Sequence, residues 1–263
     1  MLELKDLHKT FNPGTVNAKT ALNGLSLTLR DGEFVTVIGG NGAGKSTMLN
    51  ATAGTLQVDS GEVFLDGIDV TNLPEYKRAS YIGRVFQDPM MGTAPSMHIE
   101  ENLALAARRG QKRGLRWGIS KEERETYRTM LRDLGLGLET RLSSEVSTLS
   151  GGQRQALTLL MATLKSPKLL LLDEHTAALD PKTAAKVMDL TDRIVKERLT
   201  TLMITHNMRD AIQYGSRLIM LHEGRVILDI SGEEKKHLTV TDLLAQFAKA
   251  SGDEFASDRA LLS

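Results

Sequence analysis

Apolar and polar residues alternate along the first third of the chain, as they do in half-buried β-strands. The stretch from Glu33 to Ile38 is different, because it is continuously apolar and rich in β-branched side chains, which predicts a buried strand. Asp31 and Gly32, a turn signal, stand directly before it. The strands predicted in this part of the chain are 1–9, 21–30, 33–38, 61–67 and 81–86.

The spacing of apolar residues becomes helical in the middle of the chain and returns to an α/β pattern after Pro167. Helices are predicted at 99–109, 121–134, 182–198 and 208–214, and strands at 168–172, 200–205, 216–221 and 225–230. The fold class predicted is therefore α/β, with a mixed β core at 1–88 and 166–235 and a helical insertion at about 89–165. We expect 1–235 to be a single domain, followed by a tail, 236–263, that begins with a short amphipathic helix.

Two segments inside the insertion carry unusual side chains. A glycine-broken basic run occupies 108–116, and we interpret it as a solvated loop rather than as a contact for phosphate or lipid headgroups. Met90, Met91 and Met97 stand near the start of the insertion. Flexible methionines suit either an adaptable contact with a partner or the core, and the pattern does not decide between these alternatives.

Composition narrows the class of protein. The 263 residues contain 33 basic and 33 acidic side chains, so no basic excess points to nucleic acid. Cysteine is absent, which rules out disulfides and thiolate metal sites. No apolar run is long enough to span a bilayer, and the first residues do not have the order of a signal peptide. We expect a cytoplasmic protein whose connection to a membrane, if any, runs through a partner.

The run Gly39 to Thr47, GGNGAGKST, matches the phosphate-binding loop pattern G-x-x-x-x-G-K-[ST] between a predicted strand and a predicted helix. Glycines let the backbone N–H groups form a nest for anions, and the helix N-terminus adds partial positive charge. Lys45 is expected to reach the β- and γ-phosphates and Ser46 to bind Mg²⁺. The candidate ATP-binding residues here are Gly39, Gly40, Asn41, Gly42, Ala43, Gly44, Lys45, Ser46 and Thr47.

Two carboxylates end the apolar strand at 168–172. In an α/β sheet, this edge is where ligands bind. Asp173 therefore suits a magnesium shell, and Glu174 suits the polarisation of an attacking water. An apolar strand that ends in acids is common by itself, so this interpretation depends on the phosphate loop.

Leu149-Ser-Gly-Gly-Gln153 is the third signal, and it resembles the signature motif of ATP-binding cassette (ABC) ATPases. Ser150 also reads as the N-cap of a helix, with free N–H groups that attract an anion. The resemblance covers roughly residues 1–235. It implies that two copies pair head to tail, so that Ser150, Gly151 and Gly152 of each copy face the γ-phosphate bound by the other.

The other motifs of the family follow in its usual order, and the resemblance assigns each a role. Gln87 resembles the Q-loop glutamine, which binds magnesium and water, and Asp180 resembles the aspartate of the D-loop. His206 resembles the switch histidine beside the γ-phosphate, and Phe11 resembles the aromatic residue that stacks on adenine. Taken alone, His206 would more often be a structural histidine and Phe11 a core residue. The place of His206 at the end of a strand favours a γ-phosphate contact, and the turn after Phe11 allows a surface position. The family commonly has proline at the position of His175, so this residue either loosens the turn or adds a titratable group.

The resemblance implies an ATPase with Mg²⁺ as cofactor and Glu174, His206 and Gln87 as its catalytic residues. The expected partners are a second copy, polytopic membrane permease subunits and a solute-binding protein, but no nucleic acid. The expected place is the inner face of the cell membrane, as a peripheral protein. Uptake of an amino-acid-type solute is favoured, and the alternatives are an efflux or lipoprotein-release ATPase or a soluble cassette ATPase outside transport.

Overall fold

An antiparallel sheet forms one end of the computed structural model, which describes residues 1–111, 118–196 and 198–251. Its strand order is β2-β1-β4-β5. Alternation along β1 buries Leu2 and Leu4, as the sequence pattern predicts, and Leu7 is buried after a register shift that breaks the period of two. The strands are β1 (Leu2–Phe11), β2 (Lys19–Leu29), β4 (Ser60–Leu65) and β5 (Ile68–Asp69).

A second sheet of six strands has the order β10-β9-β3-β8-β7-β6. All neighbours are parallel except β10, which is antiparallel to β9. The carboxyl ends of β3, β7 and β8 therefore lie at one edge of this sheet. The strands are β3 (Phe34–Gly39), β6 (Ile82–Val85), β7 (Leu169–Asp173), β8 (Thr201–Ile204), β9 (Arg217–His222) and β10 (Arg225–Ser231).

Strand β7 is apolar from Leu169 to Leu172, where both of its faces are covered, and it ends at Asp173. Leu169 and Leu171 join a cluster that contains α1 (Lys45–Ala53) and residues of both sheets. Leu170 and Leu172 point the other way and join a cluster with the helices of the middle of the chain. The strand therefore lies between two cores, and Asp173 and Glu174 stand at its carboxyl end.

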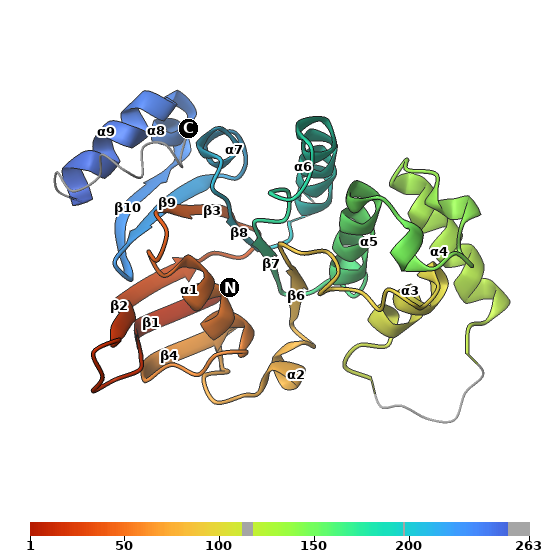
Figure 1. Cartoon of the computed structure of the whole chain (residues 1–263), viewed down its shortest axis with the longest axis horizontal. Coiled ribbons are helices and arrows are strands. Elements are labelled where there is room, and N and C mark those ends of the chain that lie inside the picture. The colour runs from red at the N-terminus through yellow and green to blue at the C-terminus, as the bar shows by residue number, and fades with distance from the viewer. Residues whose placement is uncertain (112–117, 197, 252–263) are drawn as a thin grey trace.

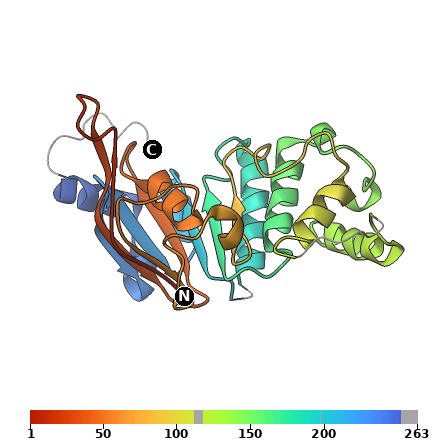
Figure 2. The same cartoon turned by 90° about the horizontal axis from the view of Figure 1, so that it is seen from below.

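The helices of the predicted insertion lie at the opposite end from the antiparallel sheet, as two views with the longest axis horizontal show (Figures 1 and 2). The prediction of a mixed α/β fold with helices in the middle of the chain is confirmed, with boundaries within a few residues of those expected. The helices of the insertion are α3 (Ile99–Ala107), α4 (Lys121–Asp133) and α5 (Gly151–Thr163), with 3₁₀ turns η1 (Leu138–Thr140) and η2 (Val146–Thr148). The short helix α2 (Glu75–Arg78) precedes the insertion, and α6 (Pro181–Val195) and α7 (Met208–Gln213) follow β7 and β8.

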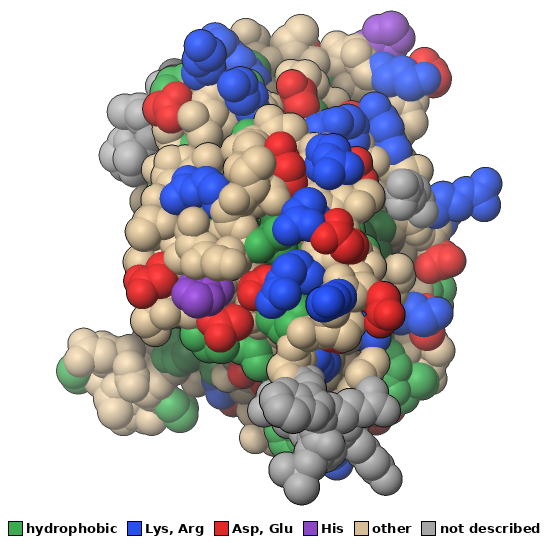
Figure 3. Space-filling model, turned by 90° about the vertical axis from the view of Figure 1, so that its right-hand side faces the viewer, with side chains coloured by type: hydrophobic (Ala, Val, Ile, Leu, Met, Phe, Trp, Pro, Cys, Tyr) green, Lys and Arg blue, Asp and Glu red, His purple; other side chains and the backbone are tan. Residues whose placement is uncertain are grey.

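Acidic and basic side chains interleave on the end of the molecule that the insertion forms (Figure 3). The basic run 108–116 lies partly outside the described residues. Within them, Arg108 pairs with Glu123 at 3.2 Å, and Arg109 donates to the carbonyl of Ala162 at 3.1 Å. Met90 and Met91 are exposed, so they are not core residues.

The C-terminal helices pack on the second sheet instead of extending away from it (Figure 1). Leu243 and Phe247 of α9 (Val240–Ser251) are buried in a cluster with Ile38, Leu218 and Met220. The expected boundary at 235/236 falls inside α8 (Gly232–His237), a short helix that the pattern did not predict. The amphipathic helix predicted for the tail is confirmed, and the division of the chain into domains stays a prediction.

Candidate functional site

The phosphate loop connects β3 to α1 and requires glycine at two of its positions. A Cβ on Gly39 (φ 155°) would lie 2.3 Å from the carbonyl oxygen of Leu221. A Cβ on Gly44 (φ 102°) would lie 2.4 Å from the carbonyl oxygen of Ala21. A side chain at either position would collide with backbone, so the loop can pass between β9 and β2 only with glycine there.

Lys45 is the first residue of α1, and it is buried. Its Nζ donates to the carbonyls of Gly39 at 2.7 Å and Gly40 at 3.0 Å. The ammonium is therefore held over the loop. An anion bound in the loop would be close to this ammonium and to the positive N-terminal end of α1.

A cavity of about 450 Å³ lies in front of the loop. It collects side chains from segments far apart in the sequence, and all but two of its lining residues were predicted ATP-binding or catalytic residues. The exposed ring of Phe11 stands at its edge, where β1 ends. The lining residues are Phe11, Lys19, Ala21, Asn41, Gly42, Ala43, Gly44, Lys45, Ser46, Thr47, Gln87, Glu174 and His206.

Lys19 and Ala21 are the two lining residues that sequence reasoning missed. Lys19 pairs with Phe11 in the register of β1 and β2, and its Nζ lies 2.9 Å from a Cβ built on Gly42. This register places a second cation beside the phosphate loop. The sequence offers no motif at Lys19, and only the pairing of the strands reveals its position.

Glu174 and His206 contact each other at the edge of the second sheet. The His206 Nε2 lies 2.5 Å from the Glu174 Oε1, and the Glu174 side chain is the more buried of the two. They meet because β7 and β8 are parallel neighbours that end together. Glu174 has a left-handed backbone, φ 46°, which is uncommon for a residue other than glycine. Such strain often marks functional sites.

Asp173, the last residue of β7, is not among the described residues that line this cavity. Burial raises the pKa of its carboxyl group, while the nearby Arg84 guanidinium and Lys45 oppose the shift. The Arg84 guanidinium lies 3.4 Å from Asp173 Oδ2 and donates to Asn50 Oδ1 at 2.7 Å. Arg84, which the sequence analysis did not single out, thus joins the β7 edge to α1.

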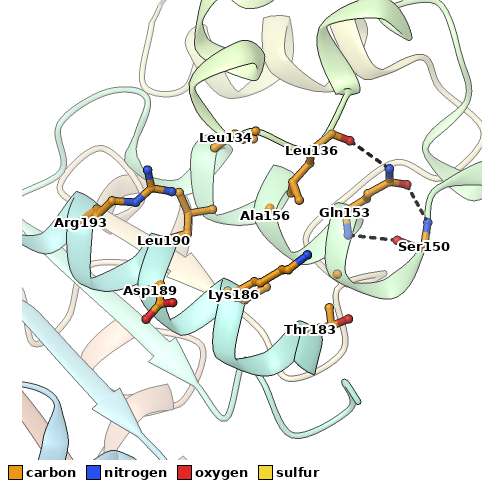
Figure 4. A pocket seen from close by; sticks show the side chains of 13 residues that line it. Leu134, Leu136, Ser150, Gln153, Ala156, Thr183, Lys186, Asp189, Leu190 and Arg193 are labelled. Carbon is orange, nitrogen blue, oxygen red and sulfur yellow. Dashed lines mark hydrogen bonds between the residues drawn. The ribbon is translucent and has the colours of Figure 1, made fainter. Parts of the chain in front are cut away.

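Ser150, Gly151 and Gly152 lie at the start of α5, away from this cavity. The Ser150 Oγ accepts from the Gln153 N–H at 3.3 Å, and Gln153 Oε1 accepts from the Ser150 N–H at 3.2 Å, so the predicted N-cap is confirmed. Ser150 and Gln153 line a separate cleft of about 580 Å³ between α5 and α6 (Figure 4). A Cβ on Gly152 would lie 2.1 Å from Thr183 Cγ2. Helices α5 and α6 therefore pack so closely at this point that glycine is favoured at position 152.

Asp180 also lies outside the nucleotide cavity, and it begins α6. Its Oδ1 accepts from the Thr183 N–H at 3.1 Å, and hydrogen bonding from the Thr183 side chain and N–H lowers the pKa of the carboxyl group. One chain therefore brings together the phosphate loop, Phe11, Gln87, Glu174 and His206. It does not bring Ser150 to Gly152 or Asp180 to the same cavity.

Comparisons with known proteins agree on one family. A family model described as "ABC transporter" matches residues 22–177. The chain is 49% identical over 251 residues to a tyrosine transport ATP-binding protein of Clostridioides difficile (strain R20291), covering 95% of this chain and 100% of that one. It is 33% identical over 249 residues to a xylose/arabinose import ATP-binding protein of Sulfolobus acidocaldarius, covering 94% and 95%.

The fold matches solved structures as well. The ATP-binding cassette MJ0796, in a dimeric post-hydrolysis state bound to ADP and Pi, superposes with a TM-score of 0.75 at 32% sequence identity. The match covers 88% of this chain and 98% of that chain. The likeness therefore extends over nearly the whole of the solved cassette.

Proposed function

The chain belongs to the ABC transporter family, and on that premise we propose that two copies bind ATP in shared sites and hydrolyse it to drive solute uptake through separate membrane subunits. The observation that carries the proposal is the cavity in front of the phosphate loop. Anion-binding backbone, two lysines, an aromatic ring and a carboxylate–histidine pair converge there. This set of groups fits a nucleoside triphosphate better than any uncharged ligand.

Hydrolysis needs little covalent chemistry from the protein. Lys45 and the loop N–H groups would stabilise the charge that develops on the transferred phosphoryl group. Glu174 would orient and polarise the attacking water, and His206, in contact with its carboxylate, would hold that carboxylate toward the γ-phosphate. Positioning and electrostatics therefore supply most of the rate enhancement.

The residues present fit Mg²⁺. Ser46 and Gln87 line the nucleotide cavity, and Asp173 ends the neighbouring strand, so hard oxygen donors surround the phosphate end. Among the described residues, no group of three or more His, Cys, Asp or Glu could hold a metal ion. We infer that the ion would be held by few protein ligands and by substrate phosphates. When bound, Mg²⁺ would neutralise phosphate charge.

A second copy would complete each site. Ser150 and Gly151 are exposed and Gly152 is buried at the start of α5, and none of the three lines the nucleotide cavity of its own chain. We infer that these residues, with Asp180, face the γ-phosphate bound by the partner copy. The cassette MJ0796 is dimeric in its structure with ADP and Pi, which supports the pairing of two copies.

The transport partners follow from the family. Among residues 1–111, 118–196 and 198–251, no helix is long and apolar enough to cross a membrane. From the family and its import relatives we infer that the cassette works with membrane permease subunits, as a peripheral protein on the cytoplasmic face, together with a solute-binding protein. The 49% identical relative is named for tyrosine transport. We accordingly infer that the solute is an amino acid, with an aromatic amino acid as the first choice to test.

Glu174→Gln tests the assignment of the general base. We expect turnover to fall by about 10²–10⁴-fold, because the amide cannot accept a proton, while ATP binding persists and the dimer accumulates. Steady-state phosphate release, equilibrium ATP binding and size-exclusion chromatography with ATP are the measurements. The matched control is Glu234→Gln, at an exposed glutamate in α8. Wild-type turnover in Glu174→Gln would refute the role of Glu174.

Mixing two inactive variants tests the shared site. Homodimers of Lys45→Ala or of Ser150→Arg each contain only damaged sites. A mixed dimer contains one intact site, with wild-type Lys45 from one copy and wild-type Ser150 from the other. We expect the mixture to regain ATPase activity that neither variant has alone. Mixed dimers that form and stay inactive would count against sites shared between copies.

A third test concerns the partner and the direction of transport. The full chain should copurify with a polytopic membrane protein from its source, and the purified complex in proteoliposomes should take up an aromatic amino acid with ATP. Export of lipoprotein or solute by the same complex would reassign it to efflux. Salt-sensitive binding of the purified chain to RNA or DNA, without a membrane partner, would exclude the transport role.

A further inference from the structure

His175 follows Glu174 directly, and its imidazole is only 2% exposed. It lies in the segment that connects β7 to α6. Its burial decides whether His175 adds a charged group beside Glu174. Burial lowers the pKa of His175 to about 4, so the ring is neutral at neutral pH. It is therefore not an additional charge beside the nucleotide cavity.

The imidazole contacts α6. His175 Nε2 lies 3.0 Å from the Thr191 Oγ1, and Thr191 is completely buried. The Thr191 hydroxyl already donates its one proton to the Val187 carbonyl, at 2.9 Å. It can therefore only accept from His175. With the Thr191 hydroxyl donating to Val187, Nε2 carries the imidazole proton and donates it to Thr191.

Contacts with the rest of the protein must hold Glu174 in its conformation. Its left-handed backbone, φ 46°, is strained for a residue with a side chain. Two main-chain bonds hold it: its N–H donates to the Ile204 carbonyl at 3.0 Å, and its carbonyl accepts from the Ala177 N–H at 2.9 Å. The first bond ties it to β8 and the second lies within its own loop. The His175–Thr191 bond ties the same loop to the middle of α6.

We propose that His175 is a positioning residue for ATP hydrolysis: by donating to Thr191 it anchors the strained Glu174 against α6, so that the Glu174 carboxylate stays in contact with His206. The inference rests on the proposed function of Glu174 as the base. It adds a group that touches neither nucleotide nor metal. Lys45 and the phosphate loop are held by α1 and β3, so weakening this anchor should leave ATP binding nearly intact.

Variants at both ends of the bond test this role. Thr191→Val keeps the shape of the side chain and removes the acceptor, so kcat should fall about 5- to 10-fold with KM for ATP unchanged within about twofold. Thr191→Ser keeps the hydroxyl, and His175→Gln places an amide N–H near the position of Nε2, so both should retain most of kcat. Wild-type kcat in Thr191→Val, or a loss that appears only in KM, would overturn the proposal.

A spectroscopic measurement keeps the inference falsifiable if a variant folds poorly. In the ¹⁵N spectrum of the wild-type full chain, we expect the His175 imidazole to be in the Nε2–H tautomer, with a slowly exchanging proton. An Nδ1–H tautomer would contradict the proposal. The two proposals also fail separately. Full turnover in Glu174→Gln would contradict the role of Glu174 as the base. Lost turnover in Glu174→Gln together with normal kcat in Thr191→Val would contradict only the positioning role of His175.

Discussion

Lys45 shows at the scale of one residue how the site is prepared for an anion. A buried ammonium must be paired or hydrogen-bonded, and here the carbonyls of Gly39 and Gly40 accept from it. The loop glycines allow these carbonyls and the neighbouring N–H groups to surround the same space. The charge is thus held in place before a phosphate arrives, which reduces the cost of ordering it on binding.

Lys45→Ala should therefore weaken ATP binding by about 10- to 100-fold, because a hydrogen bond to a charged group contributes about 1.5–3 kcal/mol. Isothermal titration with ATP measures the effect, and Lys165→Ala, at an exposed lysine, is the matched control. Unchanged affinity in Lys45→Ala would mean that the ammonium does not contact the phosphates.

At the scale of an element, the end of α1 opposite the phosphate loop is closed by a side chain from another helix. The guanidinium of Arg78, buried in the short α2, donates to the carbonyls of Ala51 at 2.7 Å and Thr52 at 2.9 Å. It also donates to Leu73 and Thr71. The last carbonyls of a helix have no partners within the helix, so a planar, forked cation satisfies several of them at once.

Arg78→Met should destabilise the protein by about 3 kcal/mol, because it leaves buried carbonyls without donors. Arg78→Lys should rescue little, since one ammonium cannot reach all four carbonyls. Urea unfolding measures both, against Lys77→Met at the exposed neighbouring residue. Equal stability of Arg78→Met and Lys77→Met would refute the capping role.

The pairing of α3 with α4 should depend on pH. Arg124 contacts the buried Glu100 carboxylate at 2.5 and 2.9 Å, and this hydrogen bonding lowers the pKa of Glu100 from its usual 4.5. The unfolded chain then binds the proton more readily. The contribution to stability is thus complete above about pH 4.5 and is lost as pH falls through the lower value in the folded protein. Glu100→Gln should remove this component from urea unfolding curves measured between pH 6 and pH 3; curves that keep the full pH dependence would contradict it.

At the scale of the whole molecule, the C-terminal segment is part of the structure that supports the site. Phe247 of α9 packs in the same cluster as Ile38, the residue before the phosphate loop. Its ring also contacts His222 edge to face, with centroids 6.0 Å apart. Helix α9, which lies outside the region 22–177 that the family model matches, therefore packs against β3 and β9 and stabilises them.

Phe247→Ala should lower the free energy of unfolding by about 3 kcal/mol, since it opens a cavity in a packed cluster. Thermal and urea unfolding of the full chain measure the loss, with Lys249→Ala, at an exposed residue of the same helix, as the control. A Phe247→Ala chain as stable as the control would show that α9 does not contribute to the core.

The local features of this protein were readable from its sequence because they depend on neighbours along the chain. Glycine spacing before Lys45 specifies an anion loop, and an apolar run before Asp173 specifies a buried strand. A serine before two glycines specifies a helix cap, and the structure has each of these elements. Even the meeting of Glu174 with His206 follows once both strands are taken as parallel, because their ends then share an edge.

Tertiary structure alone decided the contacts between segments that no local pattern relates. The register of β1 against β2 puts Lys19 beside the loop, and the packing of α6 gives His175 its partner, Thr191. The docking of α9 likewise depends on the apolar face that Ile38, Leu218 and Met220 form on the second sheet. Periodicity and motifs reveal which way a side chain faces and which ligand a loop suits. Which distant group it meets depends on how the two sheets and their helices pack together, and that is a property of the whole chain.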